Sequence, residues 1–116
     1  MKIKVKPEWK EASARGLTPG KVYDVIGIEA DYYRILTDDG EPVLYEPGFF
    51  LVVDASEPEE WVSTLGEEGE RYAYPPELNT VGFFEDWHDG DEKARRIFSE
   101  YLRRRESEGK QRGDSD

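Results

Sequence analysis

Turn signals recur at short intervals through the first half of this chain, and they limit what it can fold into. Pro19-Gly20, Asp39-Gly40 and Pro47-Gly48 each combine residues that favour tight turns. The segments between them are short and rich in β-branched and aromatic residues, with apolar side chains in alternation. This spacing favours a small antiparallel β-structure over a parallel sheet, which needs a long crossover connection between its strands.

Residues 2–54 are therefore predicted to form one barrel of five short antiparallel strands. The expected strands cover 3–5, 22–28, 32–37, 42–45 and 51–54. Trp9 is expected to reach the core, and residues 10–17 lack periodicity and are predicted to be a loop. The bend at 47–50 suits one 3₁₀ turn.

Residues beyond 54 add a hairpin and a helix to this prediction. A connector at 55–60 leads into a hairpin at about 61–74, which must pack on the barrel because an isolated hairpin is marginal in water. A short helical turn is expected within 77–89. A helix is predicted over 91–105, capped by Asp89 or Asp91, and its apolar residues lie on one stripe: Ala94, Ile97, Phe98, Tyr101 and Leu102. The polar tail, 106–116, is predicted to be disordered, with Gly109 marking the helix limit.

Length and composition allow one small domain over residues 1–105. Hydrophobic residues make up 36% of the 116 residues, but aromatic residues make up 13%, and these bury a large area each. The chain has no cysteine, which excludes disulfides, thiolate nucleophiles and cysteine-ligated metals. The N-terminal lysines are not followed by an apolar segment, and no apolar run is long enough to cross a bilayer, so a cytoplasmic location is expected.

Charge is distributed unevenly along the chain, whose formal net charge is −11. Residues 22–92 hold twenty acids and two bases, whereas both ends of the chain are basic. An acidic middle repels nucleic-acid phosphates and anionic membranes, and it accelerates association with a basic partner. We therefore expect a basic protein partner, without direct binding to nucleic acid or membrane.

Two segments resemble known groups of proteins. Leu17-Thr18, Gly20-Lys21 and Tyr23, followed by Tyr33-Arg34-Ile35, Asp39-Gly40-Glu41, Leu44-Tyr45 and Phe50 with Val53, match a pattern that recurs in small bacterial and phage proteins with SH3-like barrels. The match covers about a third of the chain and implies an SH3-like fold, which hosts many unrelated functions. The later segment GERYAYPPELNTVGFFEDWHDGD resembles small acidic proteins of the kind that neutralise bacterial toxins, and it implies an immunity role.

One run of residues could in principle bind a metal. Asp86, His88, Asp89 and Asp91 offer carboxylate and imidazole ligands, but their spacing fits no calcium loop and the single histidine lacks a partner for zinc. Acids at the start of a helix are the better interpretation, because they suit the positive end of the helix dipole. No metal, cofactor or catalytic residue is predicted.

The predicted function is non-enzymatic protein binding through acidic and aromatic residues. The candidate contact residues are Tyr45, Glu57, Glu59, Glu60, Glu67, Glu68, Glu70, Tyr72, Tyr74 and Trp87. Immunity against a bacterial toxin is the most specific form of this prediction. Two alternatives remain: a nucleic-acid mimic or regulator that acts on a DNA-binding protein, and a metal-dependent enzyme centred on Asp86, His88 and Asp89.

Overall fold

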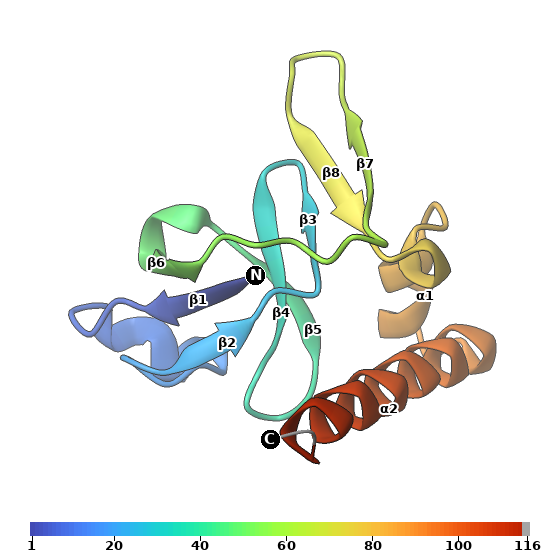
Figure 1. Ribbon diagram of the computed structural model, residues 1–116. Coiled ribbons are helices and arrows are strands. Elements are labelled where there is room, and N and C mark those ends of the chain that lie inside the picture. The colour runs from blue at the N-terminus through green and yellow to red at the C-terminus, as the bar shows by residue number, and fades with distance from the viewer. Residues whose placement is uncertain (115–116) are drawn as a thin grey trace. The chain divides into compact units, whose positions relative to one another are not determined.

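The computed structural model describes residues 1–114, and its side chains are described as far as Ser107. The fold is mainly β, with two antiparallel sheets followed by a C-terminal helix. The chain forms two compact units, Met1–Pro76 and a second that begins at Glu77. Within residues 1–114, all strands belong to the first unit, and both α-helices belong to the second (Figure 1).

The first sheet has three strands in the spatial order β2–β1–β6: β1 (Lys2–Val5), β2 (Val22–Asp24) and β6 (Phe50–Asp54). Ile3 and Val5 are fully buried, and the lysines that alternate with them remain nearer the solvent, as predicted. The exposed side chains of Leu51, Val52 and Val53 follow Phe50 in β6. The central strand β1 contributes two buried apolar side chains to this sheet, and β2 and β6 contribute one each, Tyr23 and Phe50.

The second sheet has five strands in the order β5–β4–β3–β8–β7: β3 (Gly27–Glu29), β4 (Tyr32–Leu36), β5 (Pro42–Tyr45), β7 (Val62–Leu65) and β8 (Arg71–Tyr74). The single strand predicted over 22–28 is thus two strands in different sheets. Val25 and Ile26 are both buried between them, which breaks the alternation, and their N–H groups donate to Met1 O and Arg34 O at 2.9 and 2.8 Å. The chain passes from one sheet to the other at this point.

Short 3₁₀ helices occupy three connections: η1 (Lys10–Arg15), η2 (Pro47–Phe49) and η3 (Pro76–Leu78). The predicted turn at 47–50 is confirmed by η2, but the predicted loop over 10–17 is wrong. Ala12 is fully buried there, and Gly16 ends η1 with a φ of 84° that favours glycine. A single buried residue is too little to create a periodic pattern in the sequence.

A cluster of aromatic side chains lies in the core of the first unit. Trp9 is buried as predicted and stacks on Phe49, with ring centroids 4.1 Å apart. The rings of Tyr45 and Phe50 meet Trp9 edge-on, at 6.5 and 6.1 Å. These large rings share one core with aliphatic residues such as Ile3, Val5 and Ile35, so a few rings supply much of the buried area of a small core.

The second unit contains α1 (Phe83–His88) and α2 (Glu92–Asp114). The carboxylate of Asp91 caps α2 by accepting a 2.9 Å hydrogen bond from the Ala94 N–H, which confirms one of the two predicted caps. In the predicted stripe, Ala94, Phe98 and Tyr101 are buried, and Phe98 packs edge-on against Phe84 with the ring centroids 5.8 Å apart. The short helical turn predicted within 77–89 corresponds to α1.

The helix α2 continues beyond its predicted end at residue 105. It runs to Asp114 and through most of the stretch predicted to be a disordered tail, of which residues 115–116 lie outside the described part of the chain. Arginine and glutamate, which make up residues 103–106, have high intrinsic helix propensity. A helix can therefore continue there without an apolar face, and a prediction based on burial misses it.

A substitution at Gly27 tests how closely the hairpin strand β8 approaches the rest of the sheet. A Cβ atom at this position would lie 2.2 Å from the ring of Tyr74. We expect Gly27→Ala to lower the free energy of unfolding by about 1–3 kcal/mol, the usual cost of overpacking a core, as measured by urea denaturation.

Gly48→Ala provides the matched control for this substitution. No atom lies within 4 Å of a Cβ placed there, and its φ is not in the left-handed region. We expect its unfolding free energy to stay within about 0.5 kcal/mol of that of the unmodified protein. Equal stability of the two variants would contradict the close packing of β8 on β3.

Candidate protein-binding surface

The β7–β8 hairpin joins the second sheet edge to edge through β8. Ala73 of β8 pairs with Ile28 of β3. At the turn between β3 and β4, the Asp31 N–H donates to Arg71 O at 3.0 Å, and the Arg71 N–H donates to the Asp31 carboxylate at 2.9 Å. The hairpin was predicted to pack on a barrel, and the structure instead makes it an extension of a sheet.

A buried guanidinium fixes the base of this extension. Arg34 is only 6% exposed, and it donates to Glu29 Oε1 at 3.0 Å, to the Tyr74 hydroxyl at 3.1 Å and to Pro42 O at 3.2 Å. The Tyr74 hydroxyl in turn donates to Glu29 Oε1 at 3.0 Å, and burial raises the pKa of Tyr74. The hydrogen bonds satisfy a charge that would otherwise be costly to bury.

The hairpin and its connector carry an excess of acid. Residues 55–74 hold six glutamates and a single base, Arg71. Arg71 forms a bidentate ion pair with Glu57, which lowers the pKa of that carboxyl, and it also donates to Ser63 Oγ at 2.8 Å. The only positive charge of this segment is thereby neutralised within it.

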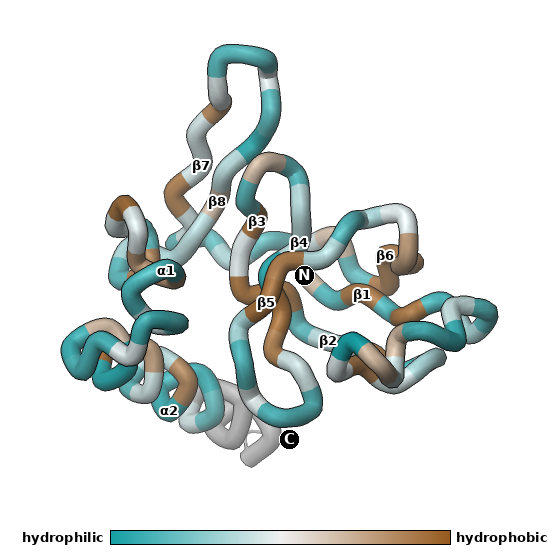
Figure 2. Tube along the Cα trace, turned by 180° about the vertical axis from the view of Figure 1, so that it is seen from behind, coloured by the Kyte–Doolittle hydropathy of each residue, from teal (hydrophilic) through white to brown (hydrophobic). Residues whose placement is uncertain are grey.

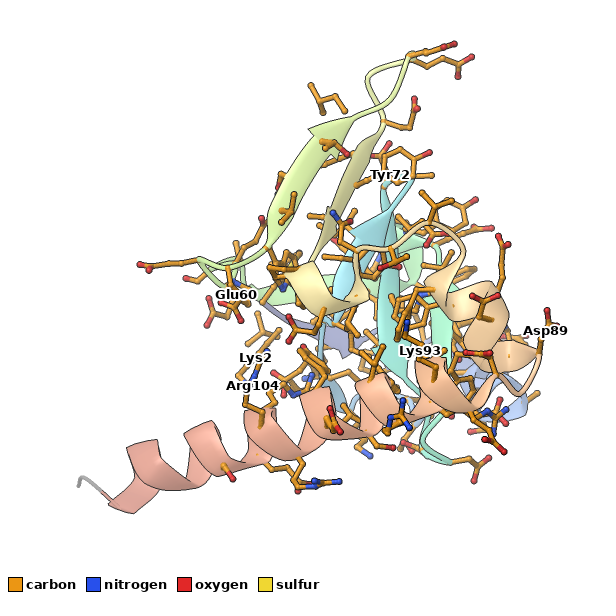
Figure 3. All side chains as sticks on the ribbon, turned by 90° about the vertical axis from the view of Figure 1, so that its right-hand side faces the viewer. Lys2, Glu60, Tyr72, Asp89, Lys93 and Arg104 are labelled. Atoms are coloured by element: carbon orange, nitrogen blue, oxygen red, sulfur yellow. The ribbon has the colours of Figure 1, made fainter. Side chains whose placement is uncertain are left out.

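The remaining glutamates lie at the two ends of the hairpin. Glu59 and Glu60 are exposed in the turn before Trp61, and Glu67 and Glu68 are exposed at the tip. Figure 3 labels Glu60 near the base of the hairpin, and Figure 2 shows the tip as hydrophilic. Glu70 is half-buried, and its carboxylate accepts a 3.1 Å hydrogen bond from the Glu68 N–H. The structure thus brings the glutamates of two separate sequence clusters onto one hairpin.

Among the predicted aromatic contact residues, only Tyr72 lies on this surface. It is partly exposed on β8 (Figure 3). Tyr45 is 1% exposed and donates to Arg15 O at 2.6 Å, and Tyr74 is 5% exposed in the Arg34 network. The assignment of Tyr45 and Tyr74 as contact residues is therefore corrected, because both rings are buried within the fold.

Trp87 belongs to the second unit, where it packs within the helical pair. Its ring meets Phe98 edge-on at 6.1 Å, and the guanidinium of Arg95 lies 4.5 Å from the ring centroid. Arg95 also donates to Trp87 O at 3.0 Å. These contacts give Trp87 a role in joining α1 to α2.

Two exposed apolar residues of the hairpin were not predicted as site residues. Val62 and Leu65 on β7 are 40% and 73% exposed. Their separation of three positions places them on opposite faces of the strand, so a single buried face cannot cover both. The sequence could have indicated this exposure, because a spacing of three residues does not fit the two-residue period of a strand with one buried face.

The residues weighed for a metal site also lie in the second unit. His88 and Asp89 are exposed at the end of α1, and the His88 ring meets Trp87 edge-on at 5.1 Å. Among the described residues, no group of three or more histidine, cysteine, aspartate or glutamate side chains is arranged to hold a metal ion.

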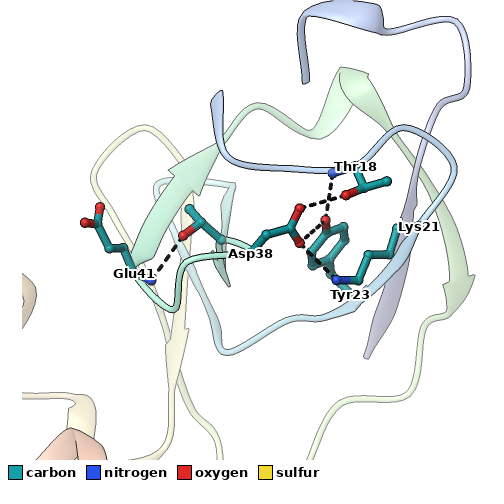
Figure 4. Close-up of polar contacts among 6 residues, drawn as sticks. Thr18, Lys21, Tyr23, Asp38 and Glu41 are labelled. Carbon is teal, nitrogen blue, oxygen red and sulfur yellow. Dashed lines mark hydrogen bonds and ion pairs between the residues drawn. The ribbon is translucent and has the colours of Figure 1, made fainter. Parts of the chain in front are cut away.

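A second polar cluster ties the turn at 18–21 to the β4–β5 turn (Figure 4). The Asp38 carboxylate accepts hydrogen bonds from Thr18 Oγ1 at 2.7 Å, from the Tyr23 hydroxyl at 2.8 Å and from Lys21 Nζ at 2.9 Å. These donors, Thr18 first among them, lower the pKa of Asp38 to about 2. The cluster satisfies a carboxylate within the fold and leaves it few positions for a ligand.

The Asp38 cluster predicts a specific acid sensitivity. Because its pKa is lower in the folded state, ionised Asp38 stabilises the fold above pH 3.8, and this contribution is lost as the pH falls from 3.8 to about 2. Asp38→Asn should be less stable at neutral pH and should lose less stability over that range. Chemical denaturation at a series of pH values measures both effects.

Asp39→Asn serves as the control, because Asp39 is the neighbouring exposed aspartate of the same turn. It should retain the full acid sensitivity of the unmodified chain. An Asp38→Asn variant whose stability falls with acid as steeply as that of Asp39→Asn would show that the cluster does not stabilise the fold.

Comparison with known proteins gives no match: no family model matches the chain, and no curated protein or solved structure matches it significantly. Within the described residues, no helix has the length and apolar character required to cross a membrane. The hairpin surface is therefore interpreted from its own chemistry.

Proposed function

We propose that this chain is a non-enzymatic protein-binding domain that presents the acidic β7–β8 hairpin to a basic partner. The observation that supports it is the pairing of Arg71 with Glu57, which leaves the exposed glutamates at both ends of the hairpin without a compensating base on that segment. Surfaces of one sign steer a partner of opposite sign and raise the rate of encounter.

The same proposal assigns residues 2–54 to the SH3-like barrels. Two features support this assignment. The segment from Val22 to Glu29 contributes one strand to each sheet, so the two sheets share a bent length of chain. The 3₁₀ turn η2 directly precedes β6, the last strand within residues 2–54, and β6 returns to pair with β1. On this assignment, the hairpin is an addition to the barrel rather than part of it.

Immunity against a toxin is the more specific form of the proposal. A toxin that cleaves nucleic acid needs a basic cleft for its substrate, and such a cleft complements an acidic hairpin. This form requires that co-expression of the chain rescue cells from the cognate toxin, whereas the broader proposal requires only binding.

Charge removal at the hairpin tests the broader proposal. The variant replaces Glu59, Glu60, Glu67 and Glu68 with glutamine, and its basic partner is first captured from cells and purified. We expect association to slow by about tenfold at low salt, since electrostatic steering changes association rates by roughly 10–10³-fold. Dissociation should change less, because exposed charges at the rim of an interface remain hydrated. Stopped-flow measurements across a salt series provide both rates.

Glu8→Gln with Glu11→Gln is the control, since both residues are exposed acids outside the hairpin. This control should retain most of the association rate and its dependence on salt, which screens charges over about 8 Å at physiological ionic strength. If the hairpin variant and the control behaved alike, or if the partner were itself acidic, the proposed function would be wrong.

A further inference from the structure

The strand β7 forms one edge of the five-stranded sheet and lacks the usual protection of an edge. Its four residues, Val62–Leu65, are all exposed, and the strand contains no charge and no proline. Natural edge strands are commonly protected from further pairing by charged residues, proline or bulges. At the opposite edge, β5 begins with Pro42 and has no fully exposed residue.

The register of the hairpin determines which backbone groups of β7 point outward. The Gly66 N–H donates to Glu70 O at 2.8 Å, and hydrogen-bonded pairs alternate in an antiparallel ladder. In this register, the backbone N–H and C=O groups of Val62 and Thr64 form hydrogen bonds with β8. The N–H and C=O groups of Ser63 and Leu65 therefore point away from β8. The other side of β8 is consistent with this register. Arg71, which is paired with Leu65, accepts a hydrogen bond from the Asp31 N–H at its carbonyl oxygen, on the side of β8 that faces β3.

These outward groups are available for pairing. Among the described backbone of residues 1–114 and the described side chains of residues 1–107, no hydrogen bond from a turn, loop or side chain involves the backbone of Ser63 or Leu65. The strand thus offers two donors and two acceptors in a row, next to the exposed side chains of Val62 and Leu65. This is the arrangement that strand-adding ligands use.

The charges at the two ends of β7 indicate which kind of strand can pair with it. Glu59 and Glu60 precede β7, and Glu67 and Glu68 follow it. If two copies of the chain paired antiparallel through β7, the glutamates before one strand would face the glutamates after the other at both ends. Like charges brought together in this way oppose a dimer, whereas lysines or arginines at both ends of an added strand would be attracted.

We propose that β7 binds an extended basic segment of the partner, which adds to the sheet as a sixth strand. The inference rests on the proposed function and specifies how the partner is held. The segment carries lysine or arginine at both ends and uncharged, β-branched or apolar residues between them. Its backbone pairs with Ser63 and Leu65, and its middle side chains lie beside Val62 on one face and Leu65 on the other.

A synthetic peptide of this composition is the probe, with a lysine pair at each end and alternating valine and threonine between them. Amide hydrogen exchange of the full chain is followed by NMR with and without the peptide at low salt. We expect exchange at Ser63 and Leu65 to slow at least tenfold on binding, while Val62 and Thr64 are protected already by β8. Absence of binding, or binding that leaves Ser63 and Leu65 unchanged, would overturn strand addition.

A pair of substitutions at one position separates the backbone from the side chain. Leu65→Pro removes an outward N–H that the fold does not use, which edge strands tolerate, and Leu65→Ala removes most of the side chain but keeps the N–H. We expect peptide affinity to fall at least tenfold more in Leu65→Pro than in Leu65→Ala, with both variants giving the far-ultraviolet dichroism of the unmodified chain. Equal affinities would overturn the proposal.

Two further results distinguish the possible failures. If Ser63 and Leu65 were protected without peptide, and sedimentation showed a dimer, the occupant would be a second copy of the chain and the proposal would be wrong. If the glutamine variant slowed association with the basic partner but Leu65→Pro bound that partner like Leu65→Ala, strand addition would fail and the proposed function would stand.

Discussion

The arrangement of the hairpin depends on one buried charge. Arg34 in β4 donates to groups on three other strands of the same sheet: Glu29 of β3, Pro42 of β5 and Tyr74 of β8. Removing one partner of a buried charge is costly, at about 3–5 kcal/mol, because the charge that remains is left uncompensated. The geometry of four strands is therefore coupled through a single side chain, and the hairpin strand β8 is one of the four.

This coupling explains how a short hairpin can carry a functional surface. A two-stranded hairpin is marginal in water, and β7 and β8 have four residues each. Pairing of β8 with β3 and the close approach of Tyr74 to Gly27 stabilise the base of the hairpin. The contacts of Asp31 with Arg71 hold the other end of β8, next to the tip. The tip extends beyond the β3–β4 turn (Figure 1). Glu67 and Glu68 are exposed there.

Features that depend on residues close together in the sequence were largely predictable. Most features that were missed depend on pairing between residues far apart in the sequence. The turn signals and apolar alternation located most strands and the hairpin, and the stripe from Ala94 to Leu102 located the helix. The sequence does not show that β8 pairs with β3, because that contact joins residues far apart in the chain. Burial of Arg34 was not predicted, since arginine is rarely buried. Tyr45 and Tyr74 were assigned to a surface because composition cannot tell which aromatic rings close a small core.

Native-state hydrogen exchange of β8 tests most directly whether the hairpin is an integral part of the sheet. Ala73 in β8 and Ile35 in β4 are both fully buried, so their amides report on the hairpin and on the body of the sheet. If the Arg34 network couples the strands, the amides of β8 and β4 will exchange with the same opening free energy, that of global unfolding. An opening free energy for β8 well below that of β4 would mean that the hairpin detaches by itself, and would contradict this account.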